Sequence, residues 1–416
     1  MKAFVGTAAN NTHLHQVGQA LEEVGGLFRF MVPFAGFPLR NPVVFARRRP
    51  VGIPPEKVAH CPTWEIIRVA AARARLPDAW IDRIWEHEEI EFARSCARVI
   101  ARERPDVYLG VEHGALEALR ESRKYGTAAG LIYTSLHHRF RERWLEPELM
   151  RFPQLLTASA GRIRQRDAAR DARRDEEILA ADFLHANSLV TARSLEEAGV
   201  APDRIITVPL GSPPALSDAD LPKAPPGAPV VLFVGNVAVH KGAHHLLEAW
   251  GRLGVSKGAR LELYGSWALP NELHPAPWGS VVECGKVAHA AVLAAMRKAS
   301  VLVLPSVCDG FGMVAAEAMA QGLPVICSSN AGASQLVVES KNGFVVPPAD
   351  PARLADRLAW CLDHPIELHA MGRNAAETAR NWTWADFRAR FSSELAAMLE
   401  RLRRSPPTGP AAGQSP

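Results

Sequence analysis

Hydrophobic and polar positions follow one another along this chain in blocks of two kinds. Short apolar runs at residues 27–32, 107–111 and 230–235 have the length and composition of strands buried on both faces. Segments in which apolar residues recur every three or four positions, such as 64–104 and 246–253, are typical of helices packed on one side. Because the two patterns alternate, the sequence predicts doubly wound α/β domains, each with a parallel sheet between helices.

The most informative block is residues 301–343. An apolar run at 301–304 predicts a buried strand, and a loop at 308–312 leads from it into an octet of good helix formers at 313–320. A further strand begins at Pro324. The block therefore predicts one strand–loop–helix–strand unit of a parallel sheet.

Two carboxylates in this block are candidates for chemistry. Glu317 is the only polar side chain of the octet, so it needs partners that offset its desolvation. Asp309 lies in the loop, where open α/β sheets bind ligands beyond the carboxyl ends of their strands. The helix N-terminus between them suits a phosphate, so a nucleotide sugar fits this arrangement. The structural alternative is that Glu317 forms a core ion pair and that Asp309 serves turn geometry.

A second strand–loop–helix unit begins at residue 230. Lys241 lies near the start of its helix, where the helix dipole disfavours a cation unless an anion binds there, although an exposed lysine is the alternative. The loops that contain Gly265 and Lys286–Val287 follow predicted strands and face the same crevice. The sequence has no P-loop, no Gly-x-Gly-x-x-Gly after a strand and no His-Glu-x-x-His, so kinase, dehydrogenase and metalloprotease functions have no support.

Two adjacent histidines, His137 and His138, follow the predicted strand that contains Ile132 and Tyr133. Histidines at the carboxyl end of a strand are placed for ligand contact, although a single histidine there is more often structural. The sequence does not decide which of the two would face a ligand.

Proline content divides the chain into parts. Six prolines lie between residues 212 and 229, which predicts a stiff linker between a first domain at 1–211 and a second at 230–384. Residues 33–63 are rich in Pro, Gly and Arg and predict a long surface loop. The low-complexity tail at 405–416 is expected to be disordered.

Composition and charge narrow the classes of protein. With no apolar run of eighteen residues and no signal peptide before the strand-like start, we expect a cytoplasmic protein. Six cysteines without Cys-x-x-Cys spacing argue against a disulfide framework and a zinc site, and a net charge of +4 is too small to imply that the protein binds nucleic acid.

Arginines are concentrated at residues 47–49 and 139–174. A solvated helix face is the simpler explanation; the alternative is an anionic partner, either the inner membrane face or an acidic acceptor.

The block at 301–343 resembles the carboxylate-x7-carboxylate signature of retaining glycosyltransferases of family 4. The matching residues are Pro305, Ser306, Gly310, Phe311, Gly312, Glu317, Ala318, Met319, Ala320, Gly322, Pro324, Val325, Asn342 and Gly343. The chain departs from the family pattern at Asp309, where Glu is usual, and at Ala331 and Gln335, where the family tends to have Gly and Glu. The shorter carboxylate bears on the identity of the donor sugar more than on the reaction.

This resemblance implies the GT-B fold, in which two Rossmann-like domains face a central cleft and the last helix, here 385–404, crosses back to the first domain. The implied reaction moves a sugar from a nucleoside-diphosphate-sugar donor to an acceptor hydroxyl, with retention and without a metal or other cofactor. A glycan, a lipid-linked and a small-molecule acceptor all stay open.

The resemblance also assigns roles to individual residues. Lys241 belongs to a segment similar to the family's Gly-Arg-x-x-x-x-Lys-Gly diphosphate clamp, in which Asn236 replaces the arginine. Glu317 would accept hydrogen bonds from the ribose hydroxyls, Asp309 would hold the sugar, and His137 or His138 would face it. The implied donor-binding residues are Gly235, Asn236, Lys241, Gly265, Lys286, Val287, Asp309, Gly310, Phe311, Gly312, Met313 and Glu317.

Two other functions stay open at this point. A nucleotide-sugar epimerase shares the two-domain architecture, and a non-catalytic nucleotide-sugar-binding subunit is suggested by the missing arginine and glutamate. Release of nucleoside diphosphate only in the presence of acceptor distinguishes a transferase from both.

Overall fold

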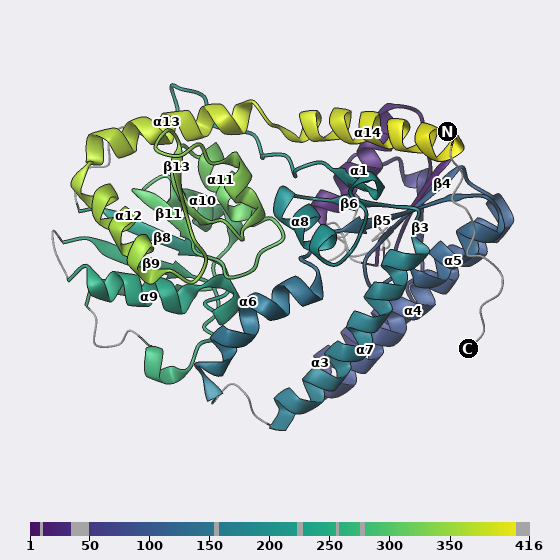
Figure 1. Ribbon diagram of the computed structural model, residues 1–416, viewed down its shortest axis with the longest axis horizontal. Helices are drawn as coiled ribbons and strands as arrows, with labels where there is room; N and C mark the ends of the chain where they lie inside the picture. Colours follow the sequence, from purple (N-terminus) through teal and green to yellow (C-terminus); the bar gives the residue numbers. More distant parts are fainter. Residues whose placement is uncertain are drawn as a thin grey trace.

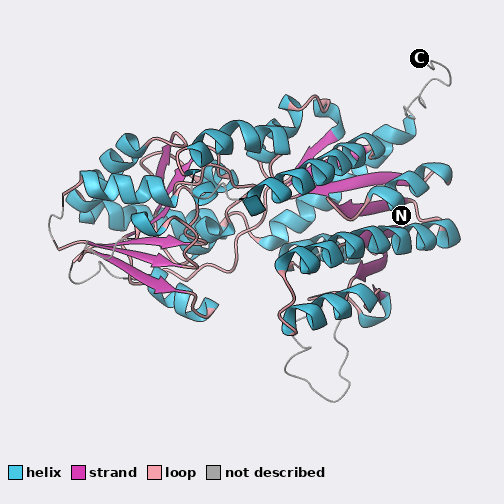
Figure 2. Cartoon of the chain, turned by 90° about the horizontal axis from the view of Figure 1, so that it is seen from below, coloured by secondary structure: helices cyan, strands magenta, loops and turns pink. Residues whose placement is uncertain are grey.

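The computed structural model describes residues 1–8, 11–34, 50–153, 158–222, 228–254, 258–274 and 279–404. Over these residues the chain forms two α/β lobes, each built on one parallel sheet with helices packed around it (Figures 1 and 2). The predicted fold class of two doubly wound domains is therefore confirmed.

In the first lobe, the described residues form a sheet in the order β3-β2-β1-β4-β5-β6-β7, and every neighbouring pair is parallel. Its strands are β1 (Ala3–Gly6), β2 (Leu27–Val32), β3 (Val58–His60), β4 (Val107–Val111), β5 (Ala128–Tyr133), β6 (Phe183–Ala186) and β7 (Ile205–Thr207). Its helices are α1 (Thr12–Glu23), α3 (Thr63–Arg73), α4 (Asp78–Glu103), α5 (Leu116–Lys124), α6 (His138–Met150), α7 (Ala158–Ala180) and α8 (Leu189–Glu197).

In the second lobe, the described strands follow the order β10-β9-β8-β11-β12-β13 and are again parallel. They are β8 (Val230–Val234), β9 (Arg260–Tyr264), β10 (Val281–Gly285), β11 (Val301–Leu304), β12 (Val325–Ser328) and β13 (Gly343–Val346). The helices are α9 (Ala243–Arg252), α10 (His289–Met296), α11 (Met313–Ala320), α12 (Pro351–Asp363), α13 (Pro365–Arg380) and α14 (Trp384–Arg404).

The central strands are buried because helices cover both of their faces. All four residues of β11 are buried, as its unbroken apolar run predicts. The chain order reverses between β1 and β4 in the first sheet and between β8 and β11 in the second. At such a reversal the loops beyond the carboxyl ends of the two strands diverge and leave a crevice, which is where ligands bind to open α/β sheets.

Two helices connect the lobes. α14, yellow in Figure 1, lies beside α1 of the first lobe, where Arg388 pairs with Glu23 and Ser392 Oγ donates to Ala20 O at 2.9 Å. α6 runs in the other direction, and Leu145 and Leu149 pack against the core of the second lobe. The two halves of the chain are thus joined on opposite sides of the molecule.

Some local expectations are wrong. The predicted loop at 33–63 contains strand β3, which pairs with β2, and the predicted helix at 64–104 is two helices, α3 and α4. Residues 35–49, including the arginines at 47–49, and the tail at 405–416 lie outside the described residues. None of the helices that are described is long and apolar enough to cross a membrane.

Candidate active site

Lys241 and Asp309 meet where the second sheet reverses direction. Lys241 ends a 3-10 turn (Val239–Lys241) after β8, and Asp309 follows β11. The Nζ atom of Lys241 lies 2.5 Å from Oδ2 of Asp309, which also accepts a longer hydrogen bond from Ser306 Oγ at 3.4 Å. The Asp309 side chain is only 12% exposed and that of Lys241 is 25% exposed, so the pair is partly desolvated.

Two glycines allow the backbone to approach closely here. Gly242 has a φ of +67°, and a Cβ at this position would come within 2.0 Å of the Pro305 carbonyl oxygen. Gly312 precedes α11 with a φ of +84°, where a Cβ would come within 2.6 Å of Leu304. The first N–H groups of α11 have no partner within the helix, so they can receive an anion beside Lys241 and Asp309.

The loop between Asp309 and α11 rests on the first lobe. The carbonyl oxygen of Gly310 accepts hydrogen bonds from Ser188 Oγ at 2.7 Å and from Thr191 Oγ1 at 3.2 Å, both at the start of α8. A Cβ on Gly310 would come within 2.3 Å of the Thr134 carbonyl oxygen. The sequence did not indicate these contacts, because they join segments more than a hundred residues apart.

Glu317 is half-buried on α11. Burial raises the pKa of Glu317, and the charge of His289 on α10 opposes that shift in part. Among the residues that the structure describes, the Glu317 carboxylate makes no hydrogen bond and no salt bridge, while its backbone oxygen accepts from Gln321 N at 3.2 Å. The core ion pair that was the structural alternative is therefore absent from the described part of the chain, and the carboxylate is available to a ligand with hydroxyl donors.

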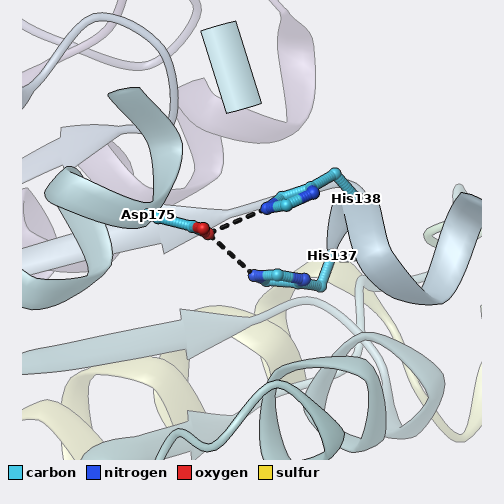
Figure 3. Close-up of side chains that lie close together, drawn as sticks. All are labelled: His137, His138 and Asp175. Atoms are coloured by element: carbon cyan, nitrogen blue, oxygen red, sulfur yellow. Dashed lines mark hydrogen bonds and ion pairs between the residues drawn. The ribbon is translucent and has the colours of Figure 1, made fainter. Parts of the chain in front are cut away.

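His137 and His138 both face Asp175 (Figure 3). Their Nε2 atoms lie 3.2 Å and 2.9 Å from the same oxygen, Oδ1, of Asp175 on α7. Burial, with the neighbouring His138, lowers the pKa of His137 to about 4. Burial alone would raise the pKa of Asp175, but the hydrogen bond and charge of His138 keep it below its ordinary value. Asp175 thus orients both rings.

Glu112 positions the loop that carries these histidines. It follows β4 and accepts hydrogen bonds from the backbone N–H and the hydroxyl of both Thr134 and Ser135, at 2.7–2.9 Å. Sequence reasoning did not assign this role to Glu112. The available signal was a carboxylate immediately after a buried strand.

The remaining predicted donor-binding residues lie at the carboxyl ends of β8, β9 and β10. Gly235 and Gly265 are packed together, since a Cβ on Gly265 would come within 1.9 Å of the Gly235 carbonyl oxygen. Asn236 is exposed, as are Lys286 and Val287. These last two follow β10, which β9 separates from β8, so they lie further along the same edge of the sheet.

Arg141 of α6 adds a positive charge that the sequence did not place at this site. Its backbone oxygen lies 3.9 Å from Cys308 Sγ, next to Asp309. Burial raises the pKa of the Cys308 thiol to about 12, and the charge of Arg141 opposes that shift. Burial lowers the pKa of His240, next to Lys241, and Arg141 contributes to that shift. The guanidinium of Arg141 itself lies 3.8 Å from Asp171 of α7, so its charge acts on Cys308 and His240 from the first lobe.

Comparison with known proteins agrees with this architecture. Residues 228–364 match the family model described as "Glycosyl transferases group 1". The D-inositol 3-phosphate glycosyltransferase of Corynebacterium efficiens is 28% identical over 327 residues, which cover 71% of this chain and 77% of that protein. D-inositol 3-phosphate glycosyltransferase 2 of Catenulispora acidiphila is 31% identical over 255 residues, or 55% of this chain and 59% of that protein.

Solved structures show the same two-lobed arrangement. Sucrose-phosphate synthase from Thermosynechococcus elongatus aligns with a TM-score of 0.62 at 18% identity, over 97% of this chain and all of that chain. Anabaena HepE in complex with UDP aligns with a TM-score of 0.61 at 15% identity, over 95% of this chain and 100% of that chain.

The two parallel sheets, with a reversal of strand order in each, define a two-domain α/β protein of the GT-B class. More particularly, the second lobe matches the family model of group 1 glycosyl transferases, and the curated relatives that the chain resembles are named as glycosyltransferases.

Proposed function

We propose that this protein is a retaining glycosyltransferase that moves a sugar from a nucleoside-diphosphate-sugar donor to an acceptor hydroxyl without a bound metal. One observation carries the proposal. Lys241 and Asp309 meet at the sheet reversal beside the N-terminus of α11, and the carboxylate of Glu317 on that helix has no hydrogen-bond partner among the described residues. These groups are complementary to a diphosphate, a sugar and a ribose.

The difficult step is departure of the nucleoside diphosphate, on which negative charge develops. Lys241 and the first N–H groups of α11 would stabilise that charge, with Arg141 as a further cation. Asp309 would then exchange its contact with Lys241 for hydrogen bonds from the sugar hydroxyls. Glu317 would accept hydrogen bonds from the two ribose hydroxyls. Preorganised donors of this kind supply much of the catalysis in group transfer without a cation.

His137 and His138 would contact the donor sugar from the first lobe. Because Asp175 holds both rings at Nε2, any contact with the sugar would come from another edge of the ring or from the backbone. Retention is supported by the resemblance of the 301–343 block to family 4. The glycosidic configuration of the product, determined by NMR, tests it.

Relatives suggest which substrates to test first. HepE has been solved with UDP, with UDP and glucose, and with UDP-glucose, which makes uridine nucleotides the first donors to examine. The curated relatives named for D-inositol 3-phosphate make a phosphorylated polyol the first small-molecule acceptor, alongside glycan and lipid-linked acceptors.

Thermal unfolding with UDP, GDP, ADP and TDP tests the donor site. At one hundred times its dissociation constant, a nucleotide that binds only the folded state adds about 2.7 kcal/mol to the free energy of unfolding. We expect one nucleotide to stabilise the wild-type protein clearly more than the others. Equal and negligible stabilisation by all four at millimolar concentration would contradict the assignment of the crevice.

A further inference from the structure

A second cluster of titratable side chains joins α6 to α9. The Nε2 atoms of His244 and His245 lie 2.8 Å and 3.0 Å from the same oxygen, Oε2, of Glu148. All three residues are more than nine-tenths buried, with exposed fractions of 5%, 2% and 8% respectively. Two imidazole nitrogens and one carboxylate oxygen therefore converge on one point in the interior.

Hydrogen bonding does not account fully for this arrangement. Nε2 of His245 makes no hydrogen bond of acceptable geometry with any described residue in spite of its short distance to Glu148, and its Nδ1 is buried without a partner as well. Nδ1 of His244 is also unpaired within the described part of the chain. Leaving a buried nitrogen without a hydrogen bond costs free energy. The direction of His245 Nε2, toward a carboxylate oxygen and near a second imidazole, therefore favours a shared cation as their partner.

We propose that Glu148, His244 and His245 form a binding site for a divalent transition metal ion, with Zn²⁺ as the best match. Two histidines and one glutamate are a ligand set that zinc uses, with three protein ligands and the fourth position open. Bonds of about 2.0–2.1 Å in a tetrahedron place ligand atoms roughly 3.3 Å apart. The observed separations from the carboxylate oxygen are 2.8 Å and 3.0 Å, so a small outward movement of the rings admits the ion.

The neighbouring charges determine how an ion would enter. Arg151 Nη1 lies 3.0 Å from the same oxygen of Glu148, and this arginine side chain is 47% exposed. Its Nη2 atom lies 3.5 Å from Glu248, so Arg151 can leave Glu148 and remain paired. A pocket of about 340 Å³ opens beside His244 and is lined also by Glu248 and His274. Because the pocket borders both His244 and Arg151, an ion would approach the ligands from this side.

The location suggests what the ion does. α9 begins directly after Lys241 and Gly242, and α6 begins at His138, so the site connects the two helices that leave the candidate active site (Figure 1). A bound ion would fix α6 against the second lobe and thereby limit movement between the lobes. The other histidine cluster, His137 and His138 with Asp175, gives less reason to expect an ion because both of its Nε2 atoms already form hydrogen bonds with Asp175.

Metal titration of the full-length protein, stripped with a chelator, tests the site. We expect wild-type protein to bind one equivalent of Zn²⁺ by calorimetry and to melt at a higher temperature with Zn²⁺ but not with Mg²⁺. His245→Gln removes a direct ligand and should weaken Zn²⁺ binding by about 100-fold or more, since loss of an outer-shell partner alone costs about 10–100-fold. His87→Gln, which alters an exposed histidine on α4, is the matched control and should bind as wild type does.

X-ray absorption of the wild-type zinc complex gives a result that does not depend on whether the variant folds. It should show two imidazole ligands and one or two oxygen ligands at about 2.0–2.1 Å. The proposal is overturned if no equivalent binds more tightly than millimolar, if His245→Gln binds like wild type, or if Asp175→Asn rather than His245→Gln abolishes binding.

Discussion

In the free protein, Lys241 and Asp309 neutralise each other at 2.5 Å. The pair is partly shielded from water. The two side chains are therefore held toward each other without the full desolvation cost of a completely buried ion pair. A diphosphate that takes Lys241 leaves Asp309 free for the sugar hydroxyls. The ion pair is thus compatible with the role predicted for each residue. When Lys241 binds the diphosphate, Asp309 becomes free to accept hydrogen bonds from the sugar.

Removing Lys241 should slow catalysis far more than it affects the fold. We expect Lys241→Ala to lower kcat/KM by roughly two orders of magnitude, since loss of one preorganised charge stabiliser costs about 3 kcal/mol in the transition state. Lys341→Ala, an exposed lysine in the same lobe, is the matched control. Turnover of Lys241→Ala equal to that of the control would remove Lys241 from the mechanism.

Ribose recognition by Glu317 can be tested with 2′- and 3′-deoxy donors. Each charge-assisted hydrogen bond to the carboxylate is worth about 1.5–3 kcal/mol, so the wild-type protein should strongly prefer the ribo donor. In Glu317→Ala the ribo and deoxy donors should become nearly equal, because the interaction is already lost. Competition binding measures both ratios. If the variant keeps the wild-type preference while its melting temperature falls, Glu317 is structural.

Among the elements, α14 follows the second lobe in the chain and packs against α1 of the first lobe. Its residues Phe387, Phe391 and Leu395 are at most 1% exposed and face the first lobe. Phe391→Ala should lower the free energy of unfolding by about 3–5 kcal/mol, the usual range for a buried phenylalanine. Arg390→Ala, on the exposed face of the same helix, should stay within about 0.5 kcal/mol of wild type. Urea unfolding measures both, and equal effects would show that α14 contributes little to stability.

His185 of β6 makes this contact sensitive to acid. Its ring packs edge-on against Phe391, with 5.1 Å between ring centroids, and burial lowers the pKa of His185 to about 4. Because the unfolded chain binds a proton near pH 6.5 and the folded chain only near pH 4, stability is lost as the pH falls between these values. The loss amounts to at most about 3 kcal/mol from this group.

Melting temperature as a function of pH checks this effect. Other buried histidines contribute in the same window, so the test is the difference between proteins. His185→Gln should reduce the slope between pH 6.5 and 4 relative to wild type. A slope identical to that of wild type would show that His185 is protonated in the folded state over this range.

Across the whole molecule, the long apolar runs predicted the central strands well. A strand that helices cover on both faces is buried along its length, so nearly all of its residues must be apolar. β3 was missed because two of its three residues at the sheet edge are only partly buried, the third, His60, is exposed, and the strand has no such apolar run. The break between α3 and α4 had a signal in Pro77, and Arg75 there adopts a φ of +54°. Lys241 and Asp309 could be placed together because both follow strands of one parallel sheet.

Contacts between distant segments could not be predicted in this way. Asp175 contacts His137 and His138 from 38 and 37 residues further along the chain, and neither spacing corresponds to a helix or strand repeat. The hydrogen bonds from Ser188 and Thr191 to Gly310 likewise depend on how the lobes meet. Such positions follow from tertiary packing rather than from local pattern.

Release of nucleoside diphosphate with and without acceptor is the most direct test of the central claim that this molecule transfers sugar. The protein is incubated with nucleotide-sugar donors, starting with UDP-glucose, against phosphorylated polyol, glycan and lipid-linked acceptors. We predict that one acceptor class accelerates release and that the new glycosidic bond keeps the donor configuration. Release at the same rate without acceptor, or donor binding with no release for any pair, would contradict the account and favour an epimerase or a binding subunit instead.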